Sequence, residues 1–76
     1  MSLYEAIMES VREEPGINGV ALVLKVVDRM GWQHTFTFQE YSMALGGLID
    51  NNHIREEEYT DPSIPYRIKS RFFPIE

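Results

Sequence analysis

The feature that most constrains this chain is a change in hydrophobic period about two thirds of the way along it. Up to residue 51, apolar residues recur mostly every three or four positions, which is the spacing of one face of a helix. Beyond that point, residues 54–59 and 66–72 are rich in β-branched and aromatic side chains, and the turn formers of residues 60–65 separate them. This order predicts helices followed by a β-hairpin.

The first predicted helix spans residues 3–14, and both of its ends carry recognisable signals. Ser2 stands three residues before Glu5, which is the spacing of a capping box. Pro15-Gly16 ends the helix, because proline cannot continue it and glycine favours a turn.

The second predicted helix runs from about Asn18 to Met30. A strand is the alternative, because valine favours sheets, but strict alternation of apolar and polar residues fails and the segment is longer than a typical strand. Asn18 suits the N-cap and Gly31 suits the C-terminal end. We expect a mostly buried helix with four apolar residues at helical spacing: Val20, Val23, Leu24 and Val27.

The third predicted helix spans residues 38–51 and follows a linker, residues 32–37, whose last three residues could form a short strand. Thr37 and Glu40 repeat the capping-box spacing, and Asn51-Asn52 is a natural left-handed exit. The apolar residues of this helix follow at steps of mostly three and four: Phe38, Tyr41, Leu45, Leu48 and Ile49.

Two adjacent glycines, Gly46 and Gly47, fall inside the third predicted helix. Each costs about 1 kcal/mol of helix stability relative to alanine. Such a cost suggests that another backbone approaches closely there, either within the fold or across a subunit interface. The alternative is a simple bend in the helix.

Composition places the chain among single globular domains. It has 76 residues, which we read as one domain over residues 1–76, with 43% hydrophobic residues and no cysteine. The absence of cysteine fits a reducing compartment, and the longest apolar-rich run, Gly19 to Val27, is too short to span a membrane. No signal-peptide pattern opens the chain. We therefore expect a cytoplasmic protein without a membrane partner.

The segments Gly19–Lys25 and Ala44–Glu57 resemble PadR-like and related winged helix-turn-helix regulators. Small residues open the second helix, and a leucine-rich segment ends the third helix before an isoleucine begins the wing. The resemblance covers roughly residues 5–71. It implies an α+β, mainly α fold, in which three helices precede a two-stranded β wing. The residues that fit these places are Leu45, Leu48, Asn52 and Ile54.

The resemblance also implies a transcription regulator whose third helix enters the DNA major groove while the wing lies near the phosphate backbone. The residues that it places at the bases are Gln39, Ser42 and Met43. The residues that it places at phosphates are the cations of the wing: Arg55, Arg67, Lys69 and Arg71.

The distribution of charge opposes this reading. The chain has 12 acidic and 7 basic residues, a net charge of −5, and the third helix carries Glu40 and Asp50 but no lysine or arginine. DNA affinity comes mainly from cations that neutralise phosphates. DNA is therefore a disfavoured partner.

The cations of the wing have two interpretations. Arg67, Lys69 and Arg71 alternate, so they share one face of a strand and could bind phosphate. The alternative, which we favour, is a cross-strand ion-pair ladder. If Tyr59 faces Tyr66, then Glu58 faces Arg67 and Glu56 faces Lys69.

The second function class is a protein–protein interaction or dimerisation module on the same scaffold. The apolar residues exceed what a small core can bury, which suggests a contact surface for a protein partner or for a homodimer. The candidate contact residues lie in the linker and at the end of the chain: Trp32, Phe72, Phe73 and Ile75.

No catalytic or metal-binding pattern is visible in the sequence. The two histidines, His34 and His53, lie far apart without a metal-ligand spacing, and Glu56-Glu57-Glu58 lacks the calcium-loop pattern. We expect no enzyme activity and no cofactor.

Overall fold

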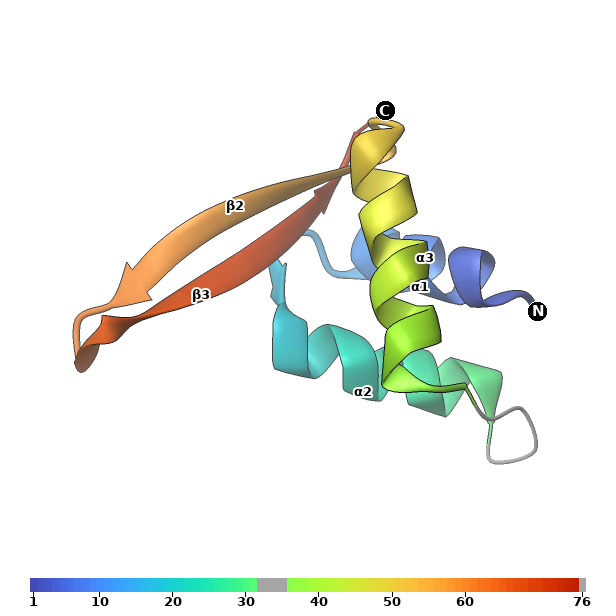
Figure 1. Cartoon of the computed structure of the whole chain (residues 1–76), viewed down its shortest axis with the longest axis horizontal. Coiled ribbons are helices and arrows are strands. Elements are labelled where there is room, and N and C mark those ends of the chain that lie inside the picture. The colour runs from blue at the N-terminus through green and yellow to red at the C-terminus, as the bar shows by residue number, and fades with distance from the viewer. Residues whose placement is uncertain (32–35, 76) are drawn as a thin grey trace.

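The structure, a computed structural model, describes residues 1–31 and 36–75, with the backbone alone at residues 65 and 66. It is an α+β fold, mainly helical, in which three helices accompany a three-stranded antiparallel sheet of order β1-β3-β2 (Figure 1). The elements in chain order are α1 (Leu3–Glu13), β1 (Ile17–Asn18), α2 (Gly19–Met30), α3 (Phe38–Asp50), β2 (Ile54–Asp61) and β3 (Ile64–Pro74).

The helix ends are set by the local signals that the sequence predicts. Each expected N-cap side chain accepts a hydrogen bond from the backbone N–H three residues further on, at Ser2, Asn18 and Thr37. The Glu40 carboxylate also accepts from the Thr37 N–H, which completes the capping box of α3. Asn52 has a φ of 61°, the left-handed exit expected after that helix.

The predicted linker is described only at its end. Residues 32–35, which include Trp32 and His34, lie outside the described residues. Phe36 and Thr37 belong to no strand, so no short strand is formed by these two residues of the linker.

The strand β1 is an element that the sequence analysis missed. It contains only Ile17 and Asn18, which pair with Phe72 and Arg71 of β3. Two residues are too few to show any hydrophobic period, and Asn18 is also the N-cap of α2. The strand is therefore defined by its partner and not by its own sequence.

The hairpin is longer than predicted, and its register is different. The strands β2 and β3 extend into the predicted loop, so the turn is confined to Pro62 and Ser63. Tyr59 faces Lys69, three residues beyond the expected partner Tyr66. A short turn, together with an irregularity between Thr60 and Asp61, accounts for the shift.

The favoured ion-pair ladder is therefore wrong. Glu58 lies opposite Ser70 and Glu56 lies opposite Phe72, so neither faces a cation. Because the register shift is an odd number of residues, the ladder residues are no longer opposite each other and the cations find other partners.

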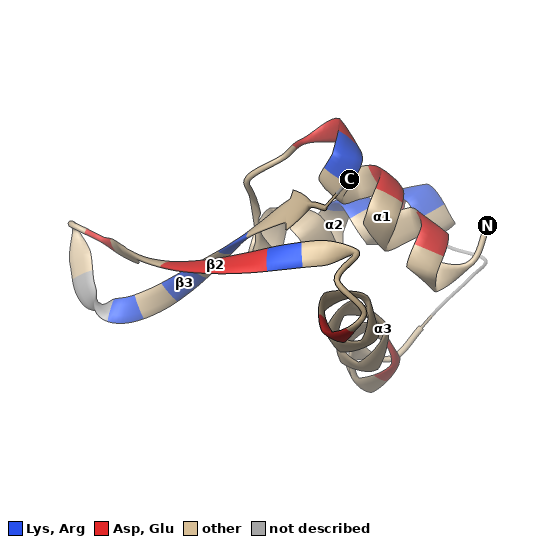
Figure 2. Cartoon of the chain, turned by 90° about the horizontal axis from the view of Figure 1, so that it is seen from above, with Lys and Arg blue, Asp and Glu red and all other residues tan. Residues whose placement is uncertain are grey.

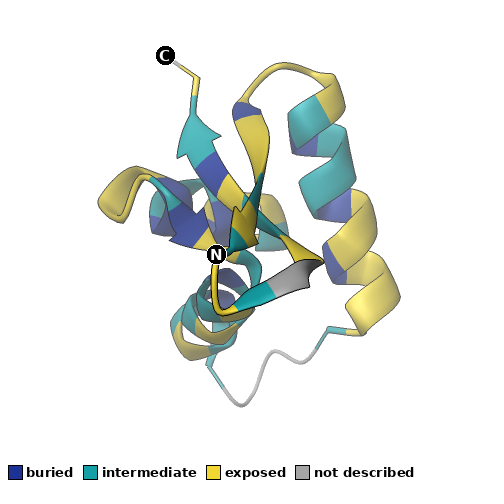
Figure 3. Cartoon of the chain, turned by 90° about the vertical axis from the view of Figure 1, so that its left-hand side faces the viewer, coloured by how far each residue is buried: buried dark blue, intermediate teal, exposed yellow. Residues whose placement is uncertain are grey.

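The core lies where the three helices meet the base of the sheet (Figure 3). The hairpin extends from this core, away from the helices (Figure 1). The buried apolar residues come from every element: Ala6, Ile7, Val11, Ile17, Leu22, Val26, Tyr41, Ala44, Leu48, Ile54 and Phe72.

Phe72, which the sequence suggested as a surface contact, is buried, with only 4% of the residue exposed. Phe72 lies at the one place where β1 covers β3, and there the helices also close over the sheet. The alternation of side chains along β3 does not distinguish its buried end from its exposed part.

The helix α2 is less buried than its sequence predicts. Leu22 and Val26 are fully buried, whereas Val20 and Leu24 are mostly exposed. The apolar stripe chosen from the sequence is therefore not the face that the core covers. None of the helices in the described part of the chain is long and apolar enough to cross a membrane.

Replacing Gly46 or Gly47 by alanine tests the packing of α3. A Cβ at either position would meet nothing within 4 Å, so the close approach suggested by the sequence does not occur among the residues that the structure describes. We expect each substitution to raise the free energy of unfolding by about 1 kcal/mol, measured by urea denaturation.

The matched control is Gly31→Ala. A Cβ there also meets nothing within 4 Å, but Gly31 has a φ of 77°, which an alanine rarely adopts, so this variant should lose stability. A loss of stability at Gly46 or Gly47 would show that a second chain packs against α3.

Candidate interaction groove

The α3 residues proposed for base contacts lie on the surface, as a groove-reading helix requires. Gln39, Ser42 and Met43 are all exposed. The only charges of α3 are nevertheless acidic (Figure 2). Hydrogen bonds from the Thr37 backbone N–H and hydroxyl lower the pKa of Glu40, so this carboxylate stays ionised beside the exposed face.

Three of the four wing cations have partners within the hairpin. The guanidinium of Arg55 lies 2.8 Å from a Glu57 carboxylate oxygen and also stacks over the ring of Phe73. Arg71 lies over the ring of Tyr59, with 4.0 Å between the guanidinium carbon and the ring centroid.

Lys69 forms its ion pair at the hairpin tip. Its Nζ lies 3.3 Å from the Asp61 carboxylate, which also accepts hydrogen bonds from the Ser63 N–H at 2.9 Å and hydroxyl at 2.7 Å. The Ser63 hydrogen bonds, followed by Lys69, lower the pKa of Asp61 to about 2. Among the described residues, Arg67 alone of the four has neither an ion pair nor a ring contact.

The cations of α2 also have acidic partners. Arg29 bonds to both Glu9 and Glu13 of α1, and the Lys25 Nζ lies 2.9 Å from Glu13. These pairs hold α1 against α2 and leave little positive charge on the helical surface.

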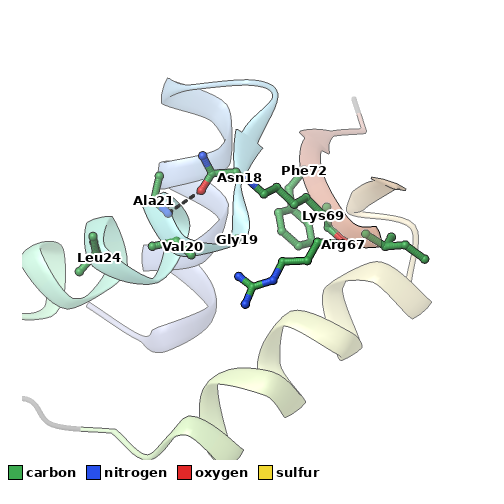
Figure 4. Close-up of a pocket in the computed structure, with 10 residues that line it drawn as sticks. Asn18, Gly19, Val20, Ala21, Leu24, Arg67, Lys69 and Phe72 are labelled. Atoms are coloured by element: carbon green, nitrogen blue, oxygen red, sulfur yellow. Dashed lines mark hydrogen bonds between the residues drawn. The ribbon is translucent and has the colours of Figure 1, made fainter. Parts of the chain in front are cut away.

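A hollow with a volume of about 700 Å³ lies between α2 and β3. We call it the α2–β3 groove. Residues 18–21 and Leu24 form one wall, and residues 67–70 with Phe72 form the other (Figure 4).

A second hollow, of about 340 Å³, lies between α2 and α3, and we call it the α2–α3 pocket. It shares Gly19, Val20 and Phe72 with the first, so the two are neighbours on one face. Its remaining walls are Val23, Phe38, Tyr41 and Leu45.

Large apolar side chains lie exposed around both hollows. Four of them are between 65% and 77% exposed: Val20, Leu24, Phe38 and Ile68. A monomeric surface seldom gathers so many large apolar groups without a binding role. The arrangement is suited to receiving a partly apolar partner.

Tyr41 lies beneath the α2–α3 pocket with its side chain only 5% exposed. Its ring lies near those of Phe36 and Phe38, with centroids 6.1 and 6.2 Å away. Its hydroxyl has no hydrogen-bond partner within the described ranges, and burial raises its pKa to about 12. The pocket floor is therefore neutral.

An excess of apolar residues was predicted from the sequence, but the contact surface was predicted at other positions. Phe73 is half-buried under Arg55, Ile75 is exposed at the end of the chain, and Trp32 lies outside the described residues. Val20, Leu24 and Ile68 were missed as contact residues. In α2, apolar residues lie around most of the helix, but the hydrophobic period alone could not show which side the core covers.

Within residues 1–31 and 36–75, no group of three or more histidine and acidic side chains could hold a metal ion. A comparison with protein-family models, curated protein sequences and solved structures finds no match to this chain.

The pKa of Asp61 offers a test of the hairpin tip. Ser63→Ala should raise it from about 2 toward the ordinary 3.8, because the hydroxyl donor is lost while the backbone donor stays. Lys69→Met should raise it less. Carbon NMR of the carboxyl group over acidic pH measures both shifts.

The lowered pKa of Asp61 determines how the stability of the fold changes with pH. The folded state holds the ionised carboxylate better than the unfolded chain, so the stabilisation from Asp61 is present above the ordinary pKa and is lost as pH falls through about 2. An unchanged pKa in Ser63→Ala would show that the hydroxyl does not bond to Asp61 in solution.

Proposed function

We propose that this chain is a non-catalytic protein-interaction domain on a winged-helix scaffold, with the α2–β3 groove and the α2–α3 pocket as its contact face. The observation that carries the proposal is the group of exposed apolar side chains around these two hollows. A regulatory role fits such a domain, since its action would depend on the partner that it holds.

The order of elements supports the winged-helix scaffold. The helices α2 and α3 follow one another, a hairpin comes directly after α3, and β1 pairs with the returning strand of that hairpin. Three helices followed by a hairpin is the order that the sequence resemblance implies, with β2 and β3 as the wing, whereas β1 is an addition that it did not include.

DNA binding is the alternative, and the electrostatics oppose it. A duplex requires several cations at its phosphates, and each contributes by releasing counterions. On the wing, only Arg67 is without a partner among the described residues, and α3 carries Glu40 and Asp50 but no lysine or arginine.

Apolar burial could supply the binding energy for a protein partner. Covering one exposed valine, leucine or phenylalanine side chain contributes about 1.5–3 kcal/mol before the costs of association. Val20, Leu24 and Phe38 lie on the same face, so one partner segment can cover more than one of them.

The proposal predicts that a random peptide library displayed on phage will yield ligands for the chain, and that Val20→Asp will abolish their binding. Val20 is exposed and lies in the first turn of α2, where an acidic side chain is favourable, so the variant should fold. Isothermal titration of the selected peptides measures the loss.

Met43→Asp is the matched control. Met43 is also a large exposed apolar side chain, but it lines neither hollow, so its replacement should leave peptide binding unchanged. A library that yields no ligand, or ligands equally sensitive to both variants, would overturn the proposal.

A second prediction separates the two function classes. Labelled random-sequence duplex DNA should show no detectable binding to the chain at low salt, measured by fluorescence anisotropy. Binding that falls steeply with salt and is weakened by Arg67→Ala would instead establish DNA as the ligand.

A further inference from the structure

We infer that the α2–β3 groove receives an extended acidic peptide segment, which adds as a strand to the free edge of β3. The inference rests on the proposed function, because it takes the same groove as the contact face. It names the conformation and the charge of the partner, which the proposed function leaves open.

The edge of β3 is free because β1 stops early. On one side, β3 is paired with β2 from Ile64 to Pro74, whereas on the other side β1 covers only Arg71 and Phe72. In that register the next pair would be Gly19 with Ser70. The chain leaves the sheet at this point, since Asn18 caps α2 and Gly19 begins it.

In the part of the chain that the structure describes, β3 from Ile64 to Ser70 therefore has a strand on one side only. Pro65 has no amide N–H, which leaves residues 66–70 as the usable edge. Five residues span roughly 17 Å at about 3.3 Å each, the length of a typical strand. An unpaired edge offers amide and carbonyl groups to an incoming segment.

The groove lies directly beside this edge. Val20 and Leu24 project from α2 toward one side of it, and Ile68 lies on β3 itself. Successive side chains of an added strand alternate in direction, so every second one could contact these apolar groups. The outer edge of β2 is different, because the exposed run Glu56-Glu57-Glu58 lies along it and discourages pairing.

The charge of the groove selects an acidic partner. Arg67 and Lys69 line it and no acidic residue does, although acidic residues outnumber basic ones by 12 to 7 in the chain. Arg67 reaches from β3 into the space between the walls (Figure 4) and has no ion pair among the described residues. Its guanidinium can bind a carboxylate with two parallel hydrogen bonds.

The net charge of −5 does not remove this preference. At physiological ionic strength, interactions between exposed charges are screened beyond about 8 Å. The cation nearest to the bound segment therefore determines which charge the groove prefers. A second copy of the chain is a poorer occupant. Two β3 edges that paired antiparallel about Ile68 would place Arg67 of each copy opposite Lys69 of the other, and these like charges repel.

The test uses peptides selected for binding to the full chain. We expect them to alternate apolar and acidic residues, and to protect from hydrogen exchange those backbone amides of residues 66–70 that point away from β2. Methylating the nitrogen of alternate peptide bonds on the pairing side should abolish binding, because a strand needs these donors. Methylating the nitrogens on the opposite side of the peptide should leave binding unchanged.

Two charge reversals isolate the groove cation. Arg67→Glu and Arg55→Glu change the net charge equally, but Arg55 lines neither hollow. We expect Arg67→Glu to weaken binding about tenfold or more, and Arg55→Glu to have little effect. Replacing the acidic residues of the peptide by lysine should restore binding to Arg67→Glu.

The outcomes separate the two proposals. If no peptide binds, the proposed function fails as well. If peptides bind in a Val20-dependent way but are helical, leave residues 66–70 unprotected or ignore Arg67→Glu, the proposed function stands and strand addition is overturned. Sedimentation that shows a dimer with those amides protected would identify a second copy as the occupant and also overturn the inference.

Discussion

The burial of Phe72 is the interaction on which the rest of this structure depends. Its backbone pairs with Ile17 and accepts a hydrogen bond of 2.8 Å from the Gly16 N–H, while its side chain enters the core. One residue thus joins the returning strand of the hairpin to the start of α2. The hairpin can extend from the helices without separating from them.

The elements that could be predicted from the sequence are those specified by neighbouring residues. The N-caps at Ser2, Asn18 and Thr37 and the left-handed exit at Asn52 depend on contacts within one turn, so short spacings reveal them. The three helices follow from the same local information. For these elements the side chain and its partner lie within a few positions of each other in the chain.

The features that were missed depend on residues far apart in the chain. The strand β1 exists only because β3 returns to it, and the pairing of Tyr59 with Lys69 depends on a turn two residues long. Periodicity showed that α2 is apolar on several sides, but the packing of α1 and the sheet against it decides which side is buried. The exposure of Val20 could therefore not be predicted from the sequence, and the candidate groove was missed with it.

The early end of β1 determines both how few residues hold it to β3 and where the proposed partner binds. If β1 were longer, it would cover the edge of β3 and fill the groove, but the chain leaves the sheet directly after Asn18, because this residue caps α2. The two pairs that remain suffice because Phe72 adds a buried side chain to the backbone pairing. The rest of the edge stays open beside the apolar residues of α2. On this argument, the position of one N-cap determines where the sheet stops and where a partner can begin.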